Sequence, residues 1–139
     1  EDIERALRFY RDILGLREKS IAIESGDFID NALGLSGAEV QTVKLYDNND
    51  GVLIELLKFL NLKTDIRSKA NTTTIGASHI AFTVDNIESI FQKLNAENIE
   101  VFGEPKISPD GNVLMTYCRD FEGNLIELVE PVLPSTNVK

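Results

Sequence analysis

Two glutamates stand in nearly identical segments that otherwise resemble buried β-strands. Glu55 lies in GVLIELLK, residues 51–58, and Glu127 lies in GNLIELVE, residues 123–130. Because side chains alternate along a strand, each glutamate shares its face with leucine or valine rather than with other polar residues. An unpaired carboxylate in such a place is costly. We therefore expect both glutamates to have a specific partner.

The only histidine, His79, offers such a partner. In SHIAFTVD, residues 78–85, Ile80, Phe82 and Val84 share the strand face that we expect to pack against a helix. His79 lies on the opposite face. One imidazole and two carboxylates suit a divalent metal, which would keep the glutamates ionised. The alternative is a structural histidine, with glutamates that pair with Lys or Arg or face water.

Two amphipathic helices are expected to position these strands. The segment 2–16 has an apolar stripe at helical spacing and Gly15 as its stop. The segment 85–99 repeats the pattern, and Asp85 with Glu88 resembles a capping box. The two helical stripes are 84 positions apart, whereas the two glutamates are 72 apart. The chain therefore looks like one unit used twice, with twelve additional residues in the first copy.

Those additional residues are placed in the polar segment 24–40, where we expect a loop with a short helical turn at 28–34. Turns are expected at 48–51, 108–111 and 121–124. Strands are expected at 17–23, 39–46, 52–59, 78–84, 99–102, 112–119 and 124–130. The second half then reads β-α-β-β-β, and the first half should match it once a strand ahead of Asp2 is supplied.

Composition limits the classes of partner. The 139 residues carry a formal net charge of −9, which argues against nucleic acid. No apolar run approaches the roughly 20 residues of a membrane span. Cys118 is the only cysteine, which excludes an intramolecular disulfide and a thiolate metal cluster and is typical of the cytoplasm.

The motifs resemble those of a known superfamily. SHIAFTVDNIESIFQKL followed by RDFEGNLIELVEP resembles the second module of the vicinal oxygen chelate superfamily, and DIERALRFYRDILGL with GVLIELLKF resembles the first. The superfamily includes glyoxalase I, methylmalonyl-CoA epimerase, extradiol dioxygenases, fosfomycin-resistance enzymes and bleomycin-binding proteins. The resemblance implies an α+β fold, two tandem βαβββ modules that form a cup-shaped mixed sheet, and a homodimer.

We divide the chain accordingly. The expected parts are a first module at 1–59 that lacks its N-terminal strand, a linker at 60–77, a second module at 78–131 and a tail at 132–139. The superfamily's fourth metal ligand, usually a histidine, would fall upstream of Glu1.

The resemblance also implies residue roles. Glu55, His79 and Glu127 match metal ligands, and the ion is a divalent metal such as Zn, Ni, Co, Mn or Fe. Superfamily enzymes of the glyoxalase and epimerase types chelate neighbouring oxygens of a small carbonyl substrate while a carboxylate moves the α-proton. Glu127 is the first candidate for this catalytic base and Glu55 the second.

The implied function is thus a divalent-metal-dependent lyase or isomerase. The alternatives are a metal-free small-molecule binding protein of the bleomycin-resistance type, an extradiol-dioxygenase-like enzyme and a degenerate partner-binding member. Glyoxalase or epimerase substrates would need cations, but nothing in the sequence groups the available ones, which are Arg17, Lys19, Lys44, Arg67, Lys106 and Arg119. Candidates for the pocket wall, for which core packing is an equally good explanation, are Phe28, Leu33, Leu35, Met115 and Tyr117.

Overall fold

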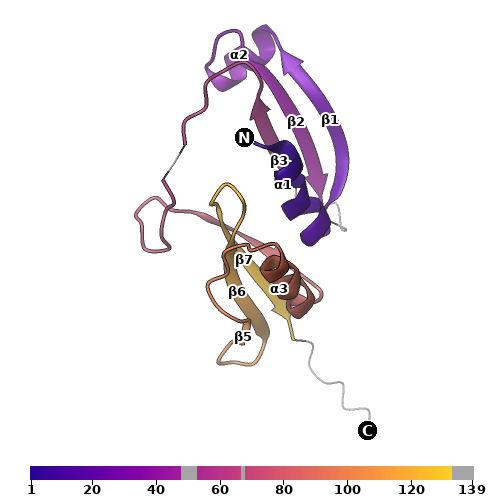
Figure 1. Ribbon diagram of the computed structural model, residues 1–139, viewed down its shortest axis with the longest axis vertical. Helices are drawn as coiled ribbons and strands as arrows, with labels where there is room; N and C mark the ends of the chain where they lie inside the picture. The colour runs from indigo at the N-terminus through magenta and orange to yellow at the C-terminus, as the bar shows by residue number, and fades with distance from the viewer. Residues whose placement is uncertain (48–52, 67, 133–139) are drawn as a thin grey trace. The chain divides into compact units, whose positions relative to one another are not determined.

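The computed structural model describes residues 1–47, 53–66 and 68–132 (Figure 1). The chain divides into two compact units, Glu1–Ser68 and Lys69–Lys139. Both contain helix and antiparallel sheet, so the expected mixed α+β class is confirmed. The expected turn at 48–51 lies outside the described residues.

The first unit begins with a helix that changes its winding. It runs as an α-helix, α1 (Ile3–Leu7), and continues as a π-helix, η1 (Arg8–Ile13). The sequence predicted one amphipathic helix over 2–16, and its apolar stripe is confirmed, since Ile3, Leu7, Tyr10 and Ile13 are buried. The π-helical winding of the second half was not predicted, and Phe9, outside the predicted stripe, is buried as well. Gly15 ends the helical segment with φ 81°, as predicted.

A three-stranded antiparallel sheet follows in the order β1-β2-β3. Its strands are β1 (Arg17–Ser25), β2 (Glu39–Tyr46) and β3 (Leu53–Phe59). Val43 and Leu45 of β2 are fully buried in the core of this unit. The short helix α2 (Asp27–Leu33) lies between β1 and β2, as the sequence predicted, and Ile29 packs there with Ala38 and Val40.

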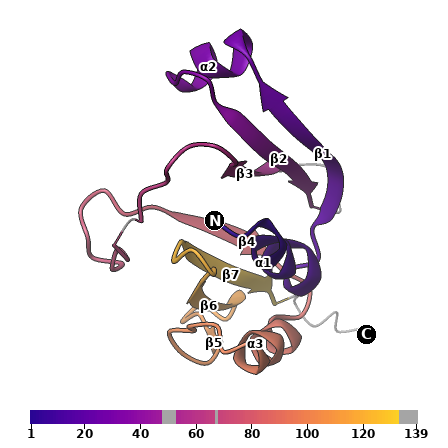
Figure 2. The ribbon, with the colours of Figure 1, turned by 45° about the horizontal axis from the view of Figure 1, so that its top comes forward.

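The second unit contains a four-stranded sheet in the order β4-β7-β6-β5 (Figure 2). Its elements in chain order are β4 (His79–Thr83), α3 (Ile87–Ala96), β5 (Lys106–Ile107), β6 (Val113–Arg119) and β7 (Leu125–Pro131). β4 pairs with β7 in parallel, and the other pairs are antiparallel. The β-α-β-β-β order is therefore confirmed.

The second strand of this unit does not lie at 99–102, so that prediction is wrong. Val101 makes only an isolated bridge with Cys118, and the paired strand is Lys106–Ile107. The cap of α3 was also misassigned to Asp85. Asn86 accepts the hydrogen bond from the Ser89 amide at 2.8 Å instead. The Ile87 amide donates to a Glu130 carboxylate oxygen at 2.6 Å, a partner supplied by β7 that no local capping pattern reveals.

One face of the second sheet forms a core with α3. Ile126 and Leu128 of β7 are fully buried, as are Ile87 and Leu94 of α3. Phe82 and Val84 are also buried and His79 is exposed, as predicted, but Ile80, which the prediction placed on the buried face, is 43% exposed. The side chains opposite the helix are therefore free to form a site. No helix in the described part of the chain is long and apolar enough to cross a membrane.

Candidate functional site

Two of the three predicted ligands meet in the second unit. His79 Nε2 lies 3.1 Å from Glu127 Oε2, and the two side chains are 46% and 16% exposed. The parallel pairing of β4 and β7 explains this approach, because His79 is level with Leu125 and Glu127 is level with Ala81. The imidazole and the carboxylate therefore stand on one sheet face, two residue pairs apart in the register.

Tyr117 of β6 completes a cluster with these residues. It is the cross-strand partner of Glu127, and its ring meets the His79 ring edge to face with centroids 5.4 Å apart. Burial raises the pKa of the Tyr117 phenol, and its hydrogen bond and proximity to the Glu127 carboxylate raise the pKa further. The phenol therefore stays protonated and donates a hydrogen bond to the Glu127 carboxylate.

A pocket of about 430 Å³ opens beside this cluster. It is lined by Thr72, Ala77, Ser78, His79, Tyr117 and Leu125. Tyr117 is thus placed at a pocket, as the sequence analysis suggested. Phe28 is 83% exposed and belongs to the other unit. Sequence reasoning missed all three of Thr72, Ala77 and Ser78, because the first two lie in the predicted linker at 60–77 and Ser78 stands at the first position of the predicted strand 78–84 without a pattern that marks a pocket.

Glu55 has a partner of a different kind. It belongs to the first unit, where its side chain is 39% exposed and lies 3.4 Å from the Lys44 ammonium. Lys44 is its cross-strand neighbour on β2. This is the simple pairing with a basic residue that the sequence left open as an alternative. The expectation of a buried, metal-dependent carboxylate is therefore not needed to explain this residue.

The other cations are dispersed. Arg17 and Lys19 line a pocket of about 520 Å³ with Glu18 and Tyr46 in the first unit. Arg119 is buried in the second unit, where it pairs with Glu100. Arg67 lies outside the described residues. The pocket beside His79 therefore has no cationic side chain among its described lining residues.

The His79 and Glu127 pair fits a divalent metal in both chemistry and spacing. Imidazole nitrogen and carboxylate oxygen are donors that several transition metals accept. Two such ligands at roughly 2.1 Å from one ion are separated by about 3 Å, close to the separation found here. Within the described residues of either unit, no three His, Cys, Asp or Glu side chains gather as a ligand group. Because each unit is described by itself, the inclusion of Glu55 stays a prediction.

Known proteins resemble this chain over nearly its whole length. The family model described as the Glyoxalase/Bleomycin resistance protein/Dioxygenase superfamily matches residues 1–128. A probable lactoylglutathione lyase from Synechocystis is 31% identical over 132 residues, which cover 93% of this chain and 87% of that protein.

Solved structures agree with this match. A glyoxalase family protein from Bacillus cereus superimposes with a TM-score of 0.84 and 26% identity, over 95% of this chain and 88% of that one. The fosfomycin resistance protein FosX from Listeria monocytogenes gives a TM-score of 0.60 at 17% identity, over 96% and 88%. At that identity, FosX supports the fold alone. The chain belongs to the Glyoxalase/Bleomycin resistance protein/Dioxygenase superfamily, the vicinal oxygen chelate group that its motifs resemble.

Proposed function

We propose that this protein is a divalent-metal-dependent lyase or isomerase of the glyoxalase type. Its substrate would be a small carbonyl compound with two neighbouring oxygens. The observation that carries the proposal is the 3.1 Å approach of His79 Nε2 and Glu127 Oε2 on one sheet face, beside a pocket. The separation suits two ligands of one ion, and the pocket leaves room for a substrate next to them.

His79 and Glu127 would hold the ion together with Glu55. When bound, a divalent metal supplies Lewis-acid stabilisation for negative charge that develops on a substrate oxygen. Zn, Ni, Co, Mn and Fe all accept this donor set. The probable lactoylglutathione lyase supports the lyase assignment, and a FosX mutant is known as a complex with Mn(II) and 1S,2S-dihydroxypropylphosphonic acid. The latter shows only that a protein of this fold can hold such an ion.

Glu127 is the proposed base for the α-proton. Its carboxylate is mostly shielded from water and yet adjoins the pocket residues His79 and Tyr117. The hydrogen bond from the Tyr117 phenol orients one side of the carboxylate, which leaves its remaining lone pairs for a proton or an ion. Glu55 is the second candidate for this role. A proton transfer by a well-placed carboxylate of this kind typically contributes about 10²–10⁴-fold in rate.

The proposal is tested by metal binding to the purified full-length protein. We expect one Mn²⁺ ion per chain by isothermal titration calorimetry, and a loss of affinity of at least about tenfold in Glu127→Gln and in His79→Ala. Glu104→Gln is the matched control, because Glu104 is an exposed carboxylate near Lys106 and far from the pocket lining. Undiminished Mn²⁺ binding in Glu127→Gln would reject the ligand assignment.

A metal-free small-molecule binding protein is the second candidate. The observation that favours it is the Lys44 partner of Glu55, which satisfies that carboxylate without an ion. In this case Mn²⁺ would not raise the melting temperature, because a molecule stabilises the native state only if it binds to that state. His79→Ala would then also leave thermal stability nearly unchanged.

A further inference from the structure

The first residues of the second unit are part of the pocket. Three of the six lining residues, Thr72, Ala77 and Ser78, precede β4; the first two come from the predicted linker at 60–77, and Ser78 directly follows it. The other three come from β4, β6 and β7. The sheet therefore provides one side of the pocket and residues 69–78, which we call the linker wall, provide the other.

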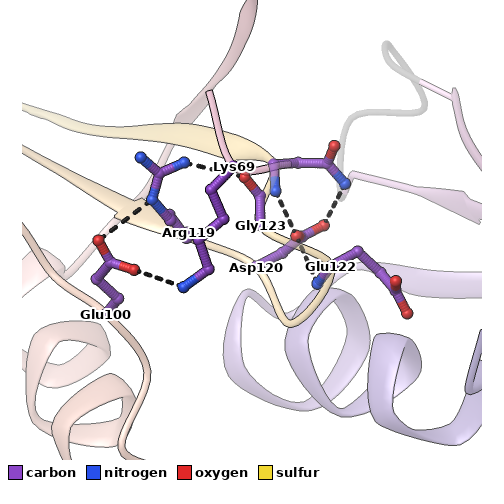
Figure 3. A network of polar contacts seen from close by, with 7 residues as sticks. Lys69, Glu100, Arg119, Asp120, Glu122 and Gly123 are labelled. Carbon is purple, nitrogen blue, oxygen red and sulfur yellow. Dashed lines mark hydrogen bonds and ion pairs between the residues drawn. The ribbon is translucent and has the colours of Figure 1, made fainter. Parts of the chain in front are cut away.

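The linker wall is held in place at its N-terminal end. The Lys69 ammonium lies 3.0 Å from Glu100 Oε2, and Glu100 Oε1 accepts a hydrogen bond from Arg119 Nε at 3.2 Å (Figure 3). Arg119 is itself buried and donates to the Gly123 carbonyl at 3.1 Å. The buried Arg119 guanidinium thus positions the Glu100 carboxylate. Because this carboxylate binds the Lys69 ammonium, it anchors the start of the linker wall to the second sheet.

The middle of the linker wall has its own hydrogen bonds. The Asn71 amide donates to Thr74 Oγ1 at 3.0 Å, and the Thr74 amide donates to the Asn71 carbonyl at 3.0 Å. The Ala77 amide then donates to the Thr74 carbonyl at 3.0 Å. Two successive turns therefore define the path from Asn71 to Ala77, and the pairing of His79 in β4 fixes the other end.

The chemistry of the lining indicates the kind of ligand. Thr72, Ser78 and Tyr117 carry hydroxyl groups, whereas Ala77 and Leu125 are apolar. Hydroxyl groups can form hydrogen bonds with hydroxyl and carbonyl oxygens of a ligand. The pocket volume of about 430 Å³ lies near the lower end of the usual range for small-molecule sites.

We propose that the linker wall selects the substrate by size: Thr72 and Ala77 admit a small, oxygen-bearing group next to His79 and restrict bulkier ones. This inference rests on the proposed metal-dependent function, since it concerns the molecule that would approach the same site. It assigns a specificity role to a segment that the sequence predicted mainly as a linker. Thr72 contributes a hydroxyl group, and Ala77 contributes space.

The test uses the full-length, Mn²⁺-loaded protein and acetohydroxamate, a small metal-chelating probe with two neighbouring oxygens. We expect Ala77→Leu to lower the affinity for acetohydroxamate by at least about tenfold, because the added methylenes occupy the pocket. Thr72→Val keeps the shape of the side chain but removes its hydroxyl group, and should lower the affinity for acetohydroxamate by roughly two- to tenfold. Thr73→Val is the matched control, because Thr73 is exposed and does not line the pocket.

The outcomes separate the two proposals. Mn²⁺ affinity should stay within about twofold of wild type in all three variants, since none replaces a proposed ligand. Normal Mn²⁺ binding with unchanged acetohydroxamate affinity in both Ala77→Leu and Thr72→Val would overturn the role of the linker wall alone. Absence of acetohydroxamate binding to Mn²⁺-loaded wild type would overturn the ligand class. Absence of Mn²⁺ binding to wild type would overturn the proposed function and this inference with it.

Discussion

Glu55 and Glu127 occupy the same tetrapeptide, LIEL, and yet have different surroundings. The difference comes from the residue opposite each one in the sheet. Lys44 faces Glu55 across β2 and β3, whereas Tyr117 faces Glu127 across β6 and β7. A lysine forms an ion pair with its neighbour, whereas the half-buried phenol of Tyr117 donates one hydrogen bond and leaves the carboxylate further capacity. Strand register therefore decides which glutamate adjoins the pocket cluster.

Cys118 provides a prediction at the scale of one residue. Its thiol is fully buried, and burial followed by the nearby Asp120 charge raises its pKa from 9.0 to about 12. Since only the thiolate reacts, we expect Ellman's reagent to leave Cys118 unmodified in the native protein at pH 8 and to modify it fully after unfolding. Rapid modification under native conditions would contradict the buried placement.

The same thiol predicts a pH dependence of stability. Its folded pKa is raised above the unfolded value, so the stabilisation is fully present below pH 9 and is lost as the pH rises from 9 towards 12. The loss should approach about 1.4 kcal/mol for each pH unit in that window. Urea unfolding of wild type and of Cys118→Ala at several pH values measures this loss, because the difference between their free energies of unfolding isolates the contribution of the Cys118 thiol. Parallel curves above pH 9 would show that the pKa is not raised.

At the scale of an element, the turn between β6 and β7 organises much of the second unit. The Asp120 carboxylate accepts hydrogen bonds from the Glu122 amide at 3.0 Å and the Asn124 amide at 2.8 Å. Gly123 has φ 86°, a conformation that a residue with a side chain adopts only at a cost. Its carbonyl accepts the hydrogen bond from Arg119. The turn thereby helps to hold the Arg119 guanidinium, which also binds Glu100.

Glu100 is expected to contribute more to stability through Arg119 than through Lys69. Arg119 is 5% exposed, so Glu100→Gln leaves a buried guanidinium without its counter-charge and should destabilise the protein by about 1–3 kcal/mol. The Lys69 side chain is mostly exposed, and Lys69→Met should cost less than about 1 kcal/mol. Chemical denaturation of the two variants measures both effects. Equal costs would indicate that Arg119 does not depend on this carboxylate.

At the scale of the whole molecule, the two units repeat a helix followed by an antiparallel meander, and the second adds β4 alongside β7. The proposed metal ligands are distributed over both units, with Glu55 in the first and His79 and Glu127 in the second. Metal binding and stability are linked, because an ion that binds the native state stabilises it, and the loss of any proposed ligand would weaken this effect.

This linkage predicts different effects for the two members of the Lys44–Glu55 pair. Glu55→Gln should lower Mn²⁺ affinity by at least about tenfold, because a ligand is lost. Lys44→Met should not lower it, because it removes only a competing partner of the carboxylate. In the metal-free protein both variants should change stability by less than about 1 kcal/mol, as expected for an exposed ion pair. Titration calorimetry and thermal unfolding measure these effects, and unchanged affinity in Glu55→Gln would remove that residue from the site.

The sequence by itself determined the positions of the main strands, the two helical segments, the short helix at Asp27–Leu33 and the superfamily. These follow from local features: alternating apolar residues predicted β2 at 39–46, and Gly15 and the segment 121–124 marked a helix stop and a turn. Patterns of this kind act over a few residues, so they can be read along the chain.

Only the tertiary structure decided which side chains meet. It paired Glu127 with His79 and Tyr117, paired Glu55 with Lys44, brought Glu130 to the start of α3 and made a linker into a pocket wall. It also widened the first helix at Arg8–Ile13, which the apolar spacing of that segment did not indicate. The physical reason is that strand register and core packing depend on contacts between distant segments, which no local pattern contains.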